Sequence, residues 1–127
     1  MAVNAIILSD KDFETIVKVT TTGTNSAASI VDASTLSGAA TDPRLSIVSC
    51  QWSIGSQTNI LFDATTPDVA LSLNGSGGYN IGGQTMPSIP NPESTGVTGD
   101  IKLTNGSASV GTVWIKLRKV SGYDNLV

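Results

Sequence analysis

The sequence contains no histidine and only one cysteine, Cys50, among its 127 residues. Histidine is the usual base that activates a serine or cysteine nucleophile, and no GxSxG elbow is present either. A single cysteine cannot form an intrachain disulfide. Because Cys50 lies in an apolar run beside Trp52, we interpret it as a small buried side chain. These absences predict no catalytic residues.

Charged residues are also scarce, at 13% of the chain, and the formal net charge is −3. Soluble domains carry about 25% charged residues. An acidic chain without a basic patch disfavours nucleic-acid binding. The one basic run, Lys116 to Lys119, contains Leu117 and is interpreted as the solvated face of a strand. The remaining surface is neutral and rich in hydroxyl groups, which favours association with other proteins.

Long apolar runs are missing as well, since no stretch approaches the roughly 20 apolar residues that span a bilayer. The first thirteen residues hold a short apolar run without a basic region or a cleavage site, so we expect no signal peptide and synthesis in a cytoplasm. The glycine-rich stretch GSGGYNIGG lacks the order of a phosphate-binding loop, and EF-hand spacing is absent. We therefore expect no cofactor, no metal and no membrane partner.

The residues that are present follow the two-residue period of β-strands. The first clear example places four side chains on one face: Phe13, Thr15, Val17 and Val19. The longest candidate strand, residues 44–54, changes its apolar phase at Val48, which indicates a bulge or a crossing between sheets. In the last clear strand, residues 112–120, three side chains are predicted to point inward: Val113, Ile115 and Leu117.

Turn signals separate these strands. Pro67 is expected at a corner, and Asn74–Gly75 is expected to form a hairpin turn. Residues 78–99 form a long connection with little regular structure. Ser9 with Asp12 could cap one helical turn. Further candidate strands cover residues 28–35, 59–63, 69–73 and 100–105.

The fold class predicted is all-β: an antiparallel β-sandwich, jelly-roll-like or Ig-like, with seven or eight short strands and at most one short helical turn near the N-terminus. The length fits one domain. Residues 1–12 are expected to form an N-terminal arm or a first strand, and residues 13–127 a single sandwich domain.

Two chemical alternatives deserve weighing. Asp63 and Glu93 could form the carboxylate pair of a small hydrolase. However, acids at strand ends more often stabilise turns, and this applies equally to Asp63, Glu93, Asp68 and Asp100. Aromatic residues make up only 5% of the chain. Exposed Trp114 and Tyr79 could form a platform on which sugars stack, but residues inside strand patterns more often pack against protein.

Four segments carry a resemblance to a known group: VDASTLSGAA, RLSIVSCQWSI, NILFDATTPDVALSLNGSG and TGDIKLTNGSASVGTVWIKLRKV. Together they span about Val31 to Val120. They resemble a group of small virion-associated proteins of tailed bacteriophages. The resemblance implies a β-sandwich on the capsid exterior that acts as a decoration or cement protein, and it supplies no catalytic or ligand residues.

The expected function is therefore that of a non-enzymatic virion protein that binds shell subunits. The expected partners are the major capsid protein and neighbouring copies of the chain, as a homotrimer or as dimers. Contacts are expected from the N-terminal arm, from residues 78–99 and from residues 121–127. The individual candidates are Ile6, Ile7, Leu8, Tyr79, Met86, Ile89, Trp114 and Tyr123.

Two points stay open at this stage. The apolar arm can add to the sheet edge of a neighbour or pair as the first strand of its own sheet. The alternative function is a carbohydrate- or host-surface-binding module of a phage tail or fibre.

Overall fold

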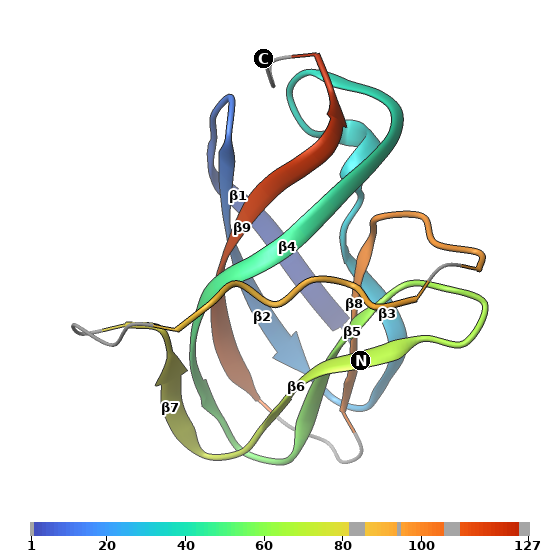
Figure 1. Ribbon diagram of the computed structural model, residues 1–127. Helices are drawn as coiled ribbons and strands as arrows, with labels where there is room; N and C mark the ends of the chain where they lie inside the picture. The colour runs from blue at the N-terminus through green and yellow to red at the C-terminus, as the bar shows by residue number, and fades with distance from the viewer. Residues whose placement is uncertain (1, 82–85, 94, 106–109, 125–127) are drawn as a thin grey trace.

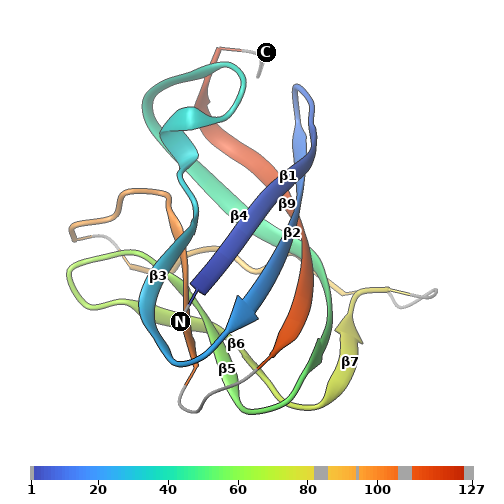
Figure 2. The ribbon, with the colours of Figure 1, turned by 180° about the vertical axis from the view of Figure 1, so that it is seen from behind.

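The computed structural model describes residues 2–81, 86–93, 95–105 and 110–124. These residues form two antiparallel sheets packed as a sandwich, which confirms the predicted fold class (Figures 1 and 2). The strands are β1 (Ala2–Asp10), β2 (Glu14–Thr22), β3 (Asn25–Val31), β4 (Ala39–Ile54), β5 (Thr58–Phe62), β6 (Asp68–Leu73), β7 (Ser76–Tyr79), β8 (Ile101–Asn105) and β9 (Gly111–Tyr123). One short 3-10 turn, η1 (Ala33–Thr35), precedes β4.

The first sheet has the order β1-β2-β9-β4-β7, and the second has the order β3-β8-β5-β6. Strand β9 lies at the centre of the first sheet, where Val113, Ile115 and Leu117 are fully buried as predicted. They face the buried side chains of the second sheet, among them Phe62 and Leu103. Burying a side chain of this size stabilises the fold by about 1.5–3 kcal/mol, so this apolar layer holds the two sheets together.

Strand β4 contains the phase change at Val48. Its pairing with β9 shifts register between Ile47 and Ser49, which identifies Val48 as an extra residue in a β-bulge. The bulge lets both Ile47 and Cys50 point into the core although they are three positions apart. Of the two explanations for the phase change, the bulge is therefore the one that the structure shows.

Two expected turns differ from the structure. Asn74–Gly75 does not close a hairpin, because it joins β6 of one sheet to β7 of the other. Gly75 adopts φ +62°, and its carbonyl accepts a hydrogen bond from the Ile54 N–H at 2.8 Å. The helical turn is η1 rather than a turn after Ser9; Asp32 caps it by accepting a hydrogen bond from the Ser34 N–H.

The N-terminal segment pairs within its own molecule. Strand β1 is antiparallel to β2, from Ala2 opposite Thr22 to Asp10 opposite Thr15. The segment is therefore the first strand of the first sheet, and it lies at the edge of that sheet.

Lys119 corrects the expectation that the basic run is a solvated strand face. It follows Leu117 by two positions and so shares the inward face of β9, where it is only 2% exposed. Its Nζ donates to Asp10 Oδ1 at 2.7 Å and to the carbonyls of Lys11 at 2.6 Å and Ser37 at 2.8 Å. A lysine ammonium has three N–H donors, and these acceptors satisfy all of them. We call this group the Lys119–Asp10 centre.

Asp10 completes this centre. Its Oδ2 accepts from the Ser37 N–H at 2.7 Å, and its Oδ1 also accepts from Thr15 Oγ1 at 3.0 Å. Burial would raise the pKa of the Asp10 carboxyl, but the hydrogen bonds from Lys119, Ser37 and Thr15 outweigh it and lower the pKa below its ordinary value. The centre thereby ties the β1–β2 turn, the loop before β4 and the end of β9 to one another.

Replacing Lys119 with Met should lower the free energy of unfolding by about 3–5 kcal/mol at neutral pH, because it leaves the Asp10 carboxylate and two carbonyls without their cation. Lys116→Met is the matched control: its Nζ lies 3.3 Å from Glu14 in a partly exposed pair, and about 1 kcal/mol or less should be lost. Urea unfolding measures both.

The stabilisation that Asp10 and Lys119 provide should depend on pH. Because the folded-state pKa of Asp10 is lowered, its contribution is present above the unfolded pKa near 3.8 and is lost as the pH falls through the folded pKa. The difference in the free energy of unfolding between the wild-type chain and Lys119→Met should therefore become smaller in acid. Equal losses for Lys116→Met and Lys119→Met would contradict this account.

Candidate docking surfaces

Within residues 2–81, 86–93, 95–105 and 110–124, no group of three or more His, Cys, Asp or Glu side chains is placed to hold a metal ion. Cys50 is buried, and burial raises the pKa of its thiol to about 12, so the thiol stays protonated at neutral pH. No helix in this part of the chain is long and apolar enough to cross a membrane.

The acids considered for hydrolysis lie at strand ends and in a turn. Asp63 Oδ2 accepts from Thr98 Oγ1 at 2.7 Å, and its Oδ1 lies 3.9 Å from Lys102 Nζ. Asp68 begins β6 opposite Phe62. Glu93 is exposed, and its backbone N–H donates to Asn91 Oδ1 at 3.0 Å. Asp63 thus stabilises a strand end through its side chain, whereas Asp68 and Glu93 are held by their backbones.

Asp100 is the acid with the least favourable surroundings. Its Oδ1 accepts a hydrogen bond from the Ala33 N–H at 2.9 Å. Burial, together with the negative charges of Asp32 and Asp63, raises the pKa of Asp100 despite that hydrogen bond and the nearby Lys102. The ionised carboxylate therefore costs stability at neutral pH.

The outer edge of β1 is the first candidate surface. Strand β1 is nine residues long, and β2 is its only partner strand in the described part of the chain. Ile6, Ile7 and Leu8 are 47–54% exposed, and the register shifts between Ile7 and Ser9. We call these three side chains and the adjoining backbone the β1 edge. An exposed apolar strand of this length is a template for pairing with another chain.

The outward face of the first sheet is the second candidate. Trp114 is 38% exposed there, between Lys18 of β2 and Gln51 of β4. Tyr79 does not share this face, because it pairs with the inward-pointing Cys50 and packs against the core. The expected two-aromatic platform is therefore not formed.

Residues 86–93 are the part of the long connection next to β4. Ile89 pairs with Ile47 through two backbone hydrogen bonds of 3.0 and 2.8 Å, and its side chain packs against the core. Figure 1 shows this segment passing across β4. Met86 is exposed, and its N–H donates to Asn80 Oδ1 at 3.1 Å. The segment is thus held to the sheet rather than projecting from it.

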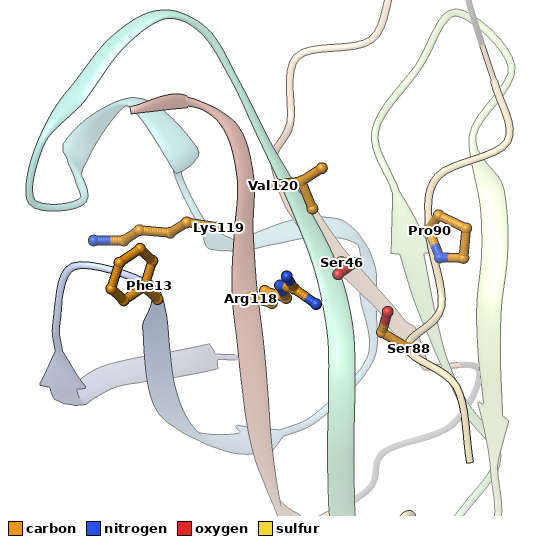
Figure 3. A pocket seen from close by; sticks show the side chains of 7 residues that line it. All are labelled: Phe13, Ser46, Ser88, Pro90, Arg118, Lys119 and Val120. Carbon is orange, nitrogen blue, oxygen red and sulfur yellow. The ribbon is translucent and has the colours of Figure 1, made fainter. Parts of the chain in front are cut away.

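A trough separates this segment from the β1–β2 turn (Figure 3). Two neighbouring cavities, of about 600 and 410 Å³, share Phe13, Ser88 and Arg118 as lining residues. Phe13 lies on one side, Ser88 and Pro90 lie on the other, and Arg118 lies between them. We call these two cavities the Phe13–Arg118 trough.

The eight expected contact residues thus divide. Ile6, Ile7, Leu8, Met86 and Trp114 are exposed, whereas Tyr79 and Ile89 are half-buried. Tyr123 is buried and donates its hydroxyl to the Ala33 carbonyl at 2.9 Å, so its expected role as a contact is corrected to one in the core. Residues 82–85, 94 and 125–127, which belong to the two other expected contact segments, lie outside the described residues.

Sequence reasoning missed Phe13 as a surface residue. Alternation placed it on one strand face with Thr15, Val17 and Val19, which are buried, but β2 begins only at Glu14, and Phe13 is 57% exposed in the turn. The run Ser9-Asp10-Lys11-Asp12 directly before it was the available signal, since such residues favour turns. Arg118 was correctly placed outward, but nothing in the sequence indicated that residues 86–93 would lie beside it.

Comparison with known proteins adds no relative. No family model matches the chain, no curated protein matches it, and no solved structure matches it.

Replacing Asp100 with Asn should raise the free energy of unfolding at neutral pH, by less than about 1 kcal/mol given the partial exposure of the site. The amide oxygen can still accept from Ala33, while the repulsion from Asp32 and Asp63 is removed. Because the folded-state pKa is raised, the gain should disappear below the unfolded pKa near 3.8.

Asp68→Asn makes the same change of charge at the start of β6 and serves as the control in urea unfolding at neutral and acid pH. A loss of stability in Asp100→Asn at neutral pH, or an equal gain in Asp68→Asn, would contradict this interpretation.

Proposed function

We propose that this chain is a non-enzymatic structural protein that decorates and stabilises the capsid of a tailed phage by binding shell subunits. The observation that carries the proposal is the β1 edge, which combines three exposed apolar side chains with a strand edge that no other described strand pairs with. The resemblance of Val31–Val120 to small virion-associated proteins supports the same conclusion.

Strand addition is the docking mode that the β1 edge favours. A strand from a shell subunit or a second copy of this chain would hydrogen-bond to the open side of β1 and extend the first sheet. Ile6, Ile7 and Leu8 would then lose their exposure to water, at a gain of about 25 cal/mol for each Å² of apolar surface buried. The main-chain hydrogen bonds supply register, and the apolar side chains supply affinity.

The β1 edge is also held in place before any partner arrives. β1 is paired to β2 along its length, and the Lys119–Asp10 centre anchors its last residue. A preformed edge loses little conformational entropy on binding. On a shell with many equivalent positions, a modest contact repeated many times gives a stable coat through avidity.

The scarcity of charge fits this role. The charged residues on the outward face of the first sheet, Glu14, Lys18, Lys116 and Arg118, lie from Trp114 toward the β1–β2 turn, and the other end presents hydroxyl side chains, among them Thr20, Ser53 and Thr112. Packing that uncharged end against protein removes few ions from water, and so the desolvation cost is small. The partners proposed are the major capsid protein and neighbouring copies of this chain, at the exterior of the virion.

Placing a charge on the β1 edge should weaken attachment to shell particles by about tenfold or more, because the carboxylate would be desolvated without a partner. The variant is Ile6→Glu with Leu8→Glu, and the measurement is co-sedimentation with particles lacking this protein. Val69→Glu is the control, since Val69 is 48% exposed on β6, which is an edge strand of the other sheet.

Unchanged attachment of the double variant would remove the β1 edge from the proposal. Immunogold labelling of virions tests the location independently. Label on the shell is expected, and absence of the chain from virions would refute the function itself.

A second function, a carbohydrate- or host-surface-binding module of a tail or fibre, is favoured by one observation. Trp114 is an exposed aromatic residue on the outward face of the first sheet, flanked by the hydrogen-bonding side chains Lys18 and Gln51. Capsid decoration predicts no signal on a glycan array. A glycan signal that Trp114→Ala abolishes, and that Val110→Ala retains, would favour the alternative instead, as would label confined to the tail.

A further inference from the structure

We propose that the Phe13–Arg118 trough binds an extended polypeptide segment that carries a carboxylate between apolar side chains. The inference rests on the proposed function, because the segment would belong to a shell subunit on which this protein docks. It assigns a second docking site, distinct from the β1 edge, and it states the chemistry of the partner.

The shape of the trough fits an extended chain. One wall is Phe13 in the β1–β2 turn, and the other is the segment that contains Ser88 and Pro90 (Figure 3). A third cavity of about 280 Å³ shares Pro90 and Val120 with the larger cavity. The two cavities of the trough, of about 600 and 410 Å³, exceed what a small carboxylic acid would fill, whereas an extended peptide can occupy both.

The walls offer apolar contact. Phe13, Met86 and Val120 all line the trough, and each has about half of its surface exposed to water. Exposed apolar residues that converge on one hollow are typical of binding sites, whereas scattered ones are not. Alternate side chains of an extended peptide can pack against them, as in other forms of peptide recognition.

Besides Lys119, two charged side chains line the trough: Glu14 and Arg118. Arg118 stands opposite Glu14 in the β2–β9 pairing, but the Glu14 carboxylate lies 3.3 Å from Lys116 Nζ. Lys119, which also lines the trough, has its ammonium group bound to Asp10. Among the described residues no carboxylate lies within 4.0 Å of the Arg118 guanidinium, and so it lacks an ion-pair partner there.

This uncompensated guanidinium determines the partner chemistry. Its planar N–H groups match a carboxylate in a two-pronged hydrogen bond, which is stronger than a neutral one. The chain as a whole carries a net charge of −3, so an arginine without an ion-pair partner among the described residues stands out against an acidic background. An acidic residue flanked by apolar ones satisfies both the guanidinium and the walls.

The test uses two short fluorescent peptides in which leucine alternates with serine around one central glutamate or one central lysine. Fluorescence anisotropy with the full chain should show binding of the glutamate peptide only. Arg118→Glu should weaken it by about tenfold or more and should bind the lysine peptide instead. Lys18→Glu makes the same charge change on the outward face away from the trough and should leave binding unchanged.

Phe13→Ala should also weaken binding of the glutamate peptide. Free acetate should not displace this peptide from the unmodified chain. Absence of binding, equal binding of both peptides, loss in Lys18→Glu equal to that in Arg118→Glu, or displacement by acetate would each overturn the proposal. Thermal unfolding of every variant verifies that the chain remains folded.

Particle co-sedimentation separates this inference from the proposed function. If the peptides fail while particles are still bound, the trough assignment falls and capsid decoration stands. If the glutamate peptide binds through Arg118 but the chain does not co-sediment with particles, the trough assignment is supported and capsid decoration is refuted.

Discussion

A lysine ammonium group enclosed by protein is the constraint on which much of this structure depends. The Lys119 ammonium group loses its hydration on burial, and hydrogen-bond acceptors placed around its three protons compensate for that loss. Those acceptors come from the β1–β2 turn and from the loop before β4. Fixing them fixes one end of the sandwich: Tyr123 lies with its ring 5.1 Å from the ammonium group, and its hydroxyl reaches η1.

Both surfaces assigned to partners inherit their geometry from this centre. Asp10 ends β1, so the centre determines where the open edge stops. The Lys119 N–H donates to the Phe13 carbonyl at 2.8 Å, which sets the position of one wall of the trough. The two proposed docking surfaces are therefore tied to one hydrogen-bonded centre, and little ordering would remain for a partner to impose.

Strand existence and inward faces could be read from the sequence because a two-residue period leaves a direct trace, as at Val113, Ile115 and Leu117. Lys119 continues that same period, but its charge favoured a position on the surface. Its burial is possible because Asp10, Lys11 and Ser37 accept hydrogen bonds from the ammonium group, and this arrangement exists only in the folded chain. The turn at Asn74–Gly75 was recognised, but a local signal does not reveal which sheet the next strand joins. The trough could not be foreseen, since it forms between segments distant in sequence.

The topology also has a consequence for the order of events at the ribosome. Asp10 and Lys119 are 109 positions apart, and most connections cross from one sheet to the other. Such long-range closure slows folding. Strands β1 and β2 can pair as a hairpin early in synthesis, but the Lys119–Asp10 centre can form only after residue 119 has left the ribosome. The apolar first strand is therefore synthesised 109 positions before the lysine that anchors its end, and exposed strands of incompletely folded chains are prone to self-association.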